Sequence, residues 1–235
     1  MGAVVSCLHK NPLNSPGVLL FMKDETIFWD VDTQFDFMRP EGKLYVPGAE
    51  TIIPKVSEVR RFALEKGYSM IADIDWHSRD NDEISDTPDF KKTFRPHCMA
   101  GEPGSQRVGY LGEVPIEYVG IEKQDVGVLR KLVAKEQFHV VIRKNSLDVF
   151  DNPNADRLVR LTKAKRAVVF GVALDFCVYY VVRGLSKLSG MQLYLLKDAV
   201  KGLGVRPDHE IFDELGQMGV GITELATLER DLKCG

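Results

Sequence analysis

The feature that most constrains the fold of this chain is a regular alternation between short apolar runs and longer segments with helical spacing of apolar residues. Such runs have the length of buried strands, and the segments between them have the length of amphipathic helices. Strands that alternate with helices form parallel sheets covered by helices. We therefore expect an α/β protein with three α/β/α layers and a central, mainly parallel sheet of about six strands. The expected strands are 26–31, 68–74, 139–143, 167–172, 192–197 and 220–223, and the expected helices are 49–66, 125–134, 154–161, 175–188, 207–218 and 225–232.

Length and composition fit one large domain. The chain has 235 residues, of which 44% are hydrophobic, and this length does not require a second domain. We expect residues 22–235 to form the domain and residues 1–21 to form a flexible extension, because its second half is rich in Pro, Asn and Ser. The polar stretch 78–120 shows little periodicity, and a loop of that length inside a compact domain is usually functional.

Charge and cysteine usage exclude several classes of protein. A net charge of -3 leaves no basic surplus to neutralise phosphates, so we expect no nucleic-acid partner. No apolar run approaches the roughly 18 to 20 residues that span a bilayer. At the N-terminus, Gly2 formally matches the pattern for myristoylation, which short sequences also match by chance. The cysteines form no CxxC motif, which predicts a reduced, cytoplasmic protein; they are Cys7, Cys98, Cys177 and Cys234.

Polar side chains follow four of the expected strands at the point where each strand ends. The first strand runs into Asp32, the second leads to Asp75 and His77, and the third is followed by Lys144. The fourth leads through a turn of small residues to Cys177. Ligands of open parallel sheets bind at the carboxyl ends of the strands, so these side chains are expected at one edge. Their chemical complementarity indicates an active site.

Cysteine catalysis accounts for three of these side chains. A cysteine attacks an acyl carbon best when a base removes its proton and a cation stabilises the thiolate. Cys177 lies just inside a helix, whose amide end should favour the thiolate. Asp32 is the candidate base and Lys144 the candidate cation, and the backbone amides of Ala173 and Cys177 are candidates for an oxyanion hole. The alternative is a structural ion pair beside a packed thiol.

A second group has the spacing of metal ligands. Asp75 and His77 are two residues apart on extended chain, so their side chains point to the same side. His97 is the best third ligand, because the other histidines fall on a terminus, a strand start and a helix. One carboxylate and two imidazoles leave open positions on Zn²⁺, Fe²⁺ or Mn²⁺. Cys98 is a further candidate as a soft ligand, and inward packing is the alternative for it.

Taken together, these segments resemble the nicotinamidases and the wider isochorismatase-like cysteine hydrolases. The likeness covers about residues 27–224 and rests on motifs in the right order: VDTQFDF at 31–37, DWH at 75–77, PHCMAG at 96–101, Lys144 at its strand end and GVALDFCV at 171–178. The chain departs from the family pattern at three sites. Leu174 stands in place of the usual threonine, and 78–82 replaces the usual continuation after DWH. The segment 145–150 also differs from the common run after the lysine, which often builds the pocket.

The resemblance implies a Rossmann-like arrangement of the sheet and a triad of Asp32, Lys144 and Cys177. It also implies a cis peptide bond between Val172 and Ala173. The reaction would be hydrolysis of a small carboxamide through a thioester acyl-enzyme with release of ammonia, and nicotinamide is the first candidate substrate.

The resemblance further implies a divalent metal, zinc in the first place with iron or manganese as alternatives, that positions the substrate ring. Its ligands would be Asp75, His77 and His97. We also expect a homo-oligomer, which is common in the family. The candidate pocket residues are Phe37, Trp76 and Leu174.

Two other functions stay open. A metal-free amidase of the same superfamily, acting on carbamoyl or maleamate-like compounds, would keep the triad without the metal ligands. A catalytically silent binding protein would have no need of thiol, base and cation together. Cys177 disfavours vinyl-ether hydrolysis, because the true isochorismatases use no cysteine. The missing GxGxxG and GxxxxGK[ST] motifs exclude a dehydrogenase and a P-loop nucleotide hydrolase.

Overall fold

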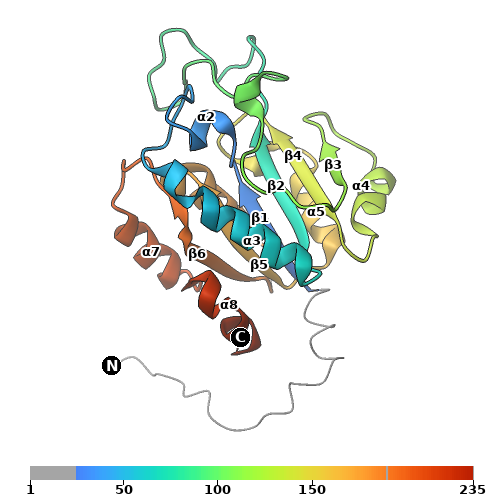
Figure 1. The fold of residues 1–235 in the computed structure, drawn as a ribbon. Helices are drawn as coiled ribbons and strands as arrows, with labels where there is room; N and C mark the ends of the chain where they lie inside the picture. Colours follow the sequence, from blue (N-terminus) through green and yellow to red (C-terminus); the bar gives the residue numbers. More distant parts are fainter. Residues whose placement is uncertain (1–24, 189, 235) are drawn as a thin grey trace.

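Seven parallel strands form one sheet at the centre of the computed structural model, which describes residues 25–188 and 190–234. Their order is β3-β4-β2-β1-β5-β6-β7, and helices cover both faces (Figure 1). The predicted three-layer α/β/α fold is confirmed. The strands are β1 (Thr26–Val31), β2 (Ser69–Asp75), β3 (Ile116–Val119), β4 (His139–Lys144), β5 (Arg166–Val172), β6 (Gln192–Lys201) and β7 (Gly221–Thr223).

The sheet has one strand more than the sequence predicts. The central strands β1 and β2 are buried along their whole length, as expected of strands covered on both faces. The additional strand, β3, lies at the sheet edge, has four residues and leaves Tyr118 half-exposed. The sequence does not predict β3, because the strand is too short and too exposed to show a buried apolar run.

The helices divide between the two faces of the sheet. Side chains of α3 and α8 belong to one apolar cluster with one set of strand residues, and side chains of α4 to α7 belong to a second cluster with the other set. Two predicted helices begin with a different kind of turn, a 3₁₀ turn η1 (Ala49–Ile52) before α3 and a π-helical turn η4 (Leu174–Val178) before α6. The helices are α2 (Phe35–Met38), α3 (Ile53–Glu65), α4 (Val126–Val133), α5 (Ala155–Thr162), α6 (Tyr179–Ser186), α7 (Asp208–Gln217) and α8 (Leu225–Cys234).

The order of the strands determines where a ligand can bind. From the central strand β1 the chain moves first to β2 and its neighbours on one side, and later to β5 and its neighbours on the other. Such a reversal leaves a crevice at the carboxyl ends of the strands. The ends of β1, β2, β4 and β5 therefore meet where the sequence places its polar side chains.

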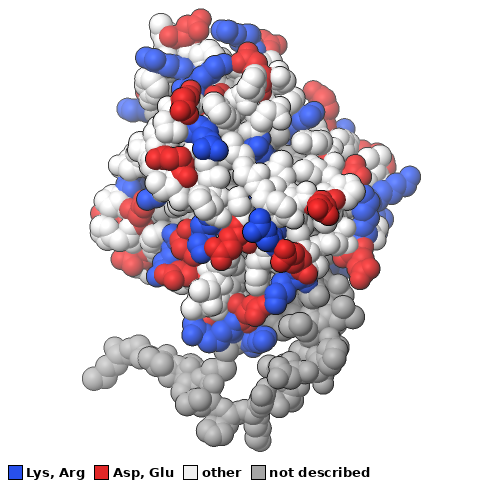
Figure 2. Space-filling view, viewed as in Figure 1, with Lys and Arg blue, Asp and Glu red and all other residues white. Residues whose placement is uncertain are grey.

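The face of the molecule drawn in Figure 2 shows no large patch of a single charge. Figure 2 shows acidic and basic side chains interspersed over the visible face. None of the described helices has the length and apolar character that crossing a membrane requires. The predicted extension 1–21, with Gly2, lies outside the described residues, so the extension and its acylation stay predictions.

Candidate active site

The ends of β1, β4 and β5 bring the three predicted triad residues together. Lys144 Nζ lies 2.9 Å from Asp32 Oδ2 and 3.7 Å from Cys177 Sγ. Asp32 and Lys144 are each 1% exposed, and Cys177 is 6% exposed. Lys144 also pairs with the carboxylate of Asp75. One ammonium group therefore contacts two buried carboxylates and lies within reach of the thiol.

The backbone at Asp32 leaves the path of the strand. Its φ angle of 46° lies in the left-handed region, which is uncommon for residues other than glycine. Its N–H donates to the carbonyl of Asp73 at 3.1 Å, which is the last backbone–backbone hydrogen bond between this segment and β2. The turn brings the carboxylate into the crevice instead of continuing the alternation of β1.

Burial dominates the electrostatics of the thiol. It raises the pKa of Cys177 well above its usual range, although the Lys144 ammonium works in the opposite direction. Burial also raises the pKa of Asp32 well above its usual range, against the same ammonium. Burial therefore outweighs the effect of the helix end, which was expected to favour the thiolate, and the neutral thiol is the resting form. A base has to take the proton when the sulfur attacks.

The turn before Cys177 has an unusual backbone. The peptide bond between Val172 and Ala173 is cis, as the resemblance implies. The carbonyl of Ala173 accepts the N–H groups of Phe176 at 3.0 Å and Val178 at 3.1 Å, so the first turn is π-helical. Turns of this type are frequent at functional sites. This one places Cys177 at the end of β5 with Val172 and Ala173 beside it on the cavity wall.

The predicted metal ligands also come together. Ligand atoms of Asp75, His77 and His97 all lie within 4.8 Å of one another, and all three residues are buried. Asp75 Oδ2 is 3.4 Å from His77 Nε2 and 3.3 Å from His97 Nε2. Cys98 is not part of the group; its Sγ lies 3.8 Å from the carbonyl oxygen of Gly104, so it packs inward.

The histidine tautomers suit a metal. His77 Nδ1 lies 3.0 Å from Asn81 Oδ1, and His97 Nδ1 lies 2.7 Å from the carbonyl oxygen of Arg95. Both Nδ1 atoms therefore carry a proton, and both Nε2 atoms turn a lone pair toward the Asp75 carboxylate. Two lone pairs facing a carboxylate are favourable only when a cation or a proton lies between them. The donor set thus fits Zn²⁺, Fe²⁺ or Mn²⁺, whose histidine ligands are usually oriented in this way.

A cavity joins the triad to the metal group. Its wall includes Asp32 and Cys177 of the triad and Asp75 and His97 of the metal group. The rest of the wall is mostly apolar. The apolar side chains include Phe37, Leu44, Phe94, Leu147, Phe176 and Leu203. A small planar molecule in this cavity would contact the thiol and the metal ligands at the same time.

Two of the three predicted pocket residues lie elsewhere. Phe37 lines the cavity, but Trp76 and Leu174 do not. Because side chains alternate along extended chain, Trp76 points away from its neighbour Asp75, and its ring packs 4.1 Å from the Arg143 guanidinium. Leu174 is fully buried in the apolar cluster that contains the side chains of α4 to α7. The threonine-to-leucine departure at Leu174 therefore changes the core and not the pocket.

Two polar residues of the site were missed by the sequence argument. Glu83 lines the cavity, is 8% exposed and has a carboxylate oxygen without a partner among the described residues. Burial and the neighbouring Asp75 raise the pKa of Glu83 to about 7. Asn81 orients His77, and its position four residues after that histidine was the available signal. Glu83 gave no signal, because it lies in a polar loop without periodicity.

Comparison with known proteins agrees with this geometry. A family model described as the isochorismatase domain matches residues 27–227. The chain belongs to the isochorismatase family. The match covers every strand from β1 to β7 except the first residue of β1, and it includes all the residues of the triad and of the metal group.

Within the family the similar proteins include nicotinamidases and pyrazinamidases. Nicotinamidase of Saccharomyces cerevisiae is 22% identical over 83% of this chain and 97% of its own length. Nicotinamidase/pyrazinamidase of Mycobacterium tuberculosis is 30% identical over 40% of this chain, and the chain spans 56% of that relative. A crystal structure of Pyrococcus horikoshii pyrazinamidase in complex with zinc is 26% identical, has a TM-score of 0.66, and covers 86% of this chain and 99% of its own. The isochorismatase-family chain is thus a hydrolase of amide C–N bonds in the nicotinamidase branch.

Proposed function

We propose that the protein is a metal-assisted cysteine amidohydrolase that converts nicotinamide into nicotinate and ammonia through a thioester. The observation that carries the proposal is that one ammonium group contacts a thiol and a carboxylate that both line the same cavity. Lys144 lies 3.7 Å from Cys177 and 2.9 Å from Asp32. The names of the relatives support the substrate, because they are nicotinamidases and a pyrazinamidase.

The first half of the reaction releases ammonia. Asp32 takes the proton of the Cys177 thiol while the sulfur attacks the carboxamide carbon and a C–S bond forms. The negative charge moves to the amide oxygen, and the N–H groups of Ala173 and Cys177 are the candidate donors to it. Asp32 then gives its proton to the amide nitrogen, the C–N bond breaks, and ammonia leaves. Lys144 keeps its charge throughout and stabilises the sulfur anion.

The second half restores the thiol. Asp32 accepts a proton from a water molecule, whose oxygen attacks the thioester carbon. The C–S bond breaks, the proton returns from Asp32 to Cys177, and the carboxylic acid leaves. The apolar wall limits the access of other water molecules to the thioester.

A divalent metal on Asp75, His77 and His97 would supply a Lewis-acid contact for the ring nitrogen of the substrate. Zinc is the first candidate, since a similar pyrazinamidase is described in complex with zinc. Phe37 forms the neighbouring part of the cavity wall, and its ring lies 5.5 Å from the His97 ring, edge-on. These residues would orient the ring so that its carboxamide points to Cys177.

The metal group also discriminates between the candidate functions. A metal-free amidase has no use for two histidines whose Nε2 atoms face one carboxylate, which favours the metal-assisted enzyme. A silent binding protein has no use for the buried triad. A cytoplasmic location and a homo-oligomer stay predictions.

A release assay with a covalent trap tests the proposal. Cys177→Ala should reduce ammonia release from nicotinamide on the order of 10³-fold or more while zinc binding and melting temperature stay close to wild type. Hydroxylamine added to the wild-type reaction should divert product from nicotinate to the hydroxamate, because it captures the thioester. Cys98→Ala is the matched control, since it removes the other buried thiol among the described residues and should keep releasing ammonia.

Several outcomes would reject parts of the proposal. Ammonia release by Cys177→Ala at the wild-type rate excludes the nucleophile. Pyrazinamide, maleamate and carbamoyl compounds in the same assay separate the substrate classes. Turnover of maleamate or a carbamoyl compound but not nicotinamide, by protein that contains no metal, supports the metal-free alternative.

A further inference from the structure

The segment that supplies the triad carboxylate also carries two buried side chains that the reaction does not use. Gln34 and Asp36 follow Asp32 by two and four residues, and they are 0% and 2% exposed. Neither lies within the group of metal ligands. Both form hydrogen bonds with the backbone of the segments that carry those ligands.

Gln34 takes the place of a missing strand neighbour. β1 pairs with β2 only as far as Val31, opposite Asp73, so the peptide groups of Asp75 have no partner from β1. The side chain of Gln34 supplies both bonds, since Oε1 accepts the Asp75 N–H at 2.8 Å and Nε2 donates to the Asp75 carbonyl at 2.8 Å. A primary amide offers the same donor and acceptor as a peptide group. Gln34 therefore extends the hydrogen-bonding ladder of β2 to its metal ligand.

Gln34 also reaches the loop on the other side. Its Nε2 donates a second bond to the carbonyl of Ser105 at 3.0 Å, and its own position pairs with Arg107 in an isolated antiparallel bridge. This one side chain thus joins the triad segment, the end of β2 and the long loop.

Asp36 holds the second ligand segment. Its Oδ2 accepts the N–H of Cys98 at 2.7 Å, and that N–H belongs to the peptide group that joins Cys98 to His97. The carbonyl of Cys98 in turn accepts the N–H of His77 at 3.2 Å. Cys98 has a φ angle of 43°, a conformation that a non-glycine residue keeps only when its surroundings hold it. The hydrogen bond to the Asp36 carboxylate stabilises this conformation of Cys98.

We propose that Gln34 and Asp36 are positioning residues that hold the backbone of the three metal ligands against the triad. The inference rests on the metal centre of the proposed function. His97 lies in the long loop, far along the chain from Asp75 and His77, so its position has to be fixed before a metal arrives. Where these bonds are missing, metal binding has to order the loop, and the ordering entropy lowers the affinity.

The test compares two glutamines whose side-chain amides form hydrogen bonds with backbone groups, the buried Gln34 and the partly buried Gln137. Gln34→Met keeps the length of the side chain and removes its three hydrogen bonds. Gln137→Met is the matched control, because Gln137 also donates its side-chain amide to two backbone carbonyls, those of Leu64 and Tyr68 at 2.9 and 3.0 Å. The zinc affinity of each variant is measured by competition with a chromophoric chelator, and the melting temperature is measured on metal-free protein.

We expect Gln34→Met to weaken zinc binding tenfold or more, as is typical when a group that orients metal ligands is lost, roughly 10- to 100-fold. The zinc affinity of Gln137→Met should stay within about threefold of wild type, even though this variant should lower the melting temperature about as much as Gln34→Met does. Asp36→Asn, which replaces a carboxylate acceptor by an amide of the same size, should also weaken zinc binding about tenfold. If Gln34→Met does not fold, Gln34→Glu takes its place, since it keeps an acceptor for the Asp75 N–H.

The outcomes separate this inference from the proposed function. Wild-type zinc affinity in the Gln34 and Asp36 variants overturns the inference and leaves the metal centre intact. An equal loss in Gln137→Met also overturns it, because the effect would then follow general stability. Wild-type protein that binds no zinc, iron or manganese overturns the metal centre itself and the inference with it.

Discussion

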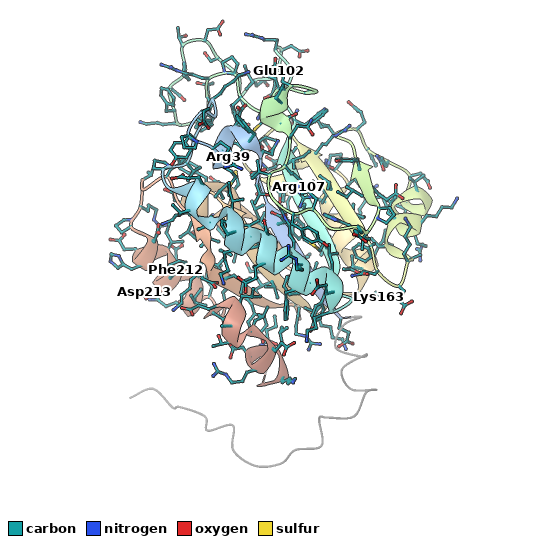
Figure 3. All side chains as sticks on the ribbon, viewed as in Figure 1. Arg39, Glu102, Arg107, Lys163, Phe212 and Asp213 are labelled. Carbon is teal, nitrogen blue, oxygen red and sulfur yellow. The ribbon has the colours of Figure 1, made fainter. Side chains whose placement is uncertain are left out.

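A buried histidine far from the metal group should make this protein sensitive to mild acid. His139 is fully buried at the start of β4, and its Nε2 accepts a hydrogen bond from Arg107 Nη1 at 3.0 Å. Arg107, which Figure 3 labels in front of the sheet, shares the carboxylate of Asp30 with Arg60. The histidine therefore faces two guanidinium groups and one carboxylate. A proton on the imidazole would add a third positive charge to this cluster.

The size of the effect follows from the pKa of His139. Burial, and then the positive charge of Arg107, lower this pKa from 6.5 to about 3. Between these values the unfolded chain binds a proton that the folded chain does not bind, so stability falls as the pH falls below 6.5. From about pH 7 to pH 5, protonation of His139 shifts the folding equilibrium toward the unfolded state by roughly a factor of 25. This shift corresponds to about 2 kcal/mol of lost unfolding free energy. The paired Asp30 loses its contribution only at lower pH, because its folded pKa lies below its ordinary value of 3.8.

The substitution His139→Gln removes the titrating group and keeps an acceptor for Arg107. Urea unfolding of metal-free protein is followed by tryptophan fluorescence at about pH 7 and pH 5. Between these pH values, wild type should lose about 2 kcal/mol more unfolding free energy than His139→Gln loses. His209→Gln, at an exposed position of α7, should lose as much as wild type. Equal losses for wild type and His139→Gln would refute the reasoning, whatever the stability of the variant at pH 7.

Two further substitutions test the turns around the cavity. Asp175→Ala should raise the KM for nicotinamide more than it lowers kcat. The Asp175 carboxylate accepts the N–H groups of Leu203 at 2.8 Å and Val205 at 2.9 Å, and Leu203 lines the cavity. Steady-state kinetics measure both parameters, and an unchanged KM would contradict this role. Gly171→Ala should cost about 3 kcal/mol or more of unfolding free energy, because the φ angle is +121° and a Cβ would collide with the Val31 carbonyl oxygen; urea unfolding measures the loss, and a stable variant would contradict the close approach.

Sequence patterns predicted the fold where strands are buried on both faces. Strands β1, β2, β4 and β5 read as apolar runs because helices cover both of their sides. β3 escaped prediction because an edge strand needs only one apolar side, and four residues cannot show an alternation. The π-helical start of the helix after β5 also gave no signal, because a change from i+4 to i+5 bonding depends on the turn that precedes it and not on apolar spacing.

The sequence predicted those residues of the site that lie at or near the ends of strands. Asp32 directly follows β1, Lys144 is the last residue of β4, and Cys177 lies in the turn after β5. The rule for parallel sheets was therefore enough to bring them together. Glu83 is placed by loop geometry alone. The pocket assignment of Trp76 ignored the alternation of side chains that correctly paired its neighbours Asp75 and His77.

The register between β2 and β4 explains why triad and metal group form one site. Asp75, the last residue of β2, lies directly opposite Lys144, the last residue of β4. The carboxylate of Asp75 can therefore turn one oxygen to the ammonium of the triad and the other to His77 and His97. A slip by one residue would move Lys144 to the other face of the sheet and separate it from both carboxylates. In the proposed enzyme, nucleophile activation and metal binding would thus depend on the same strand pairing, and a substitution that shifts this register should impair both together.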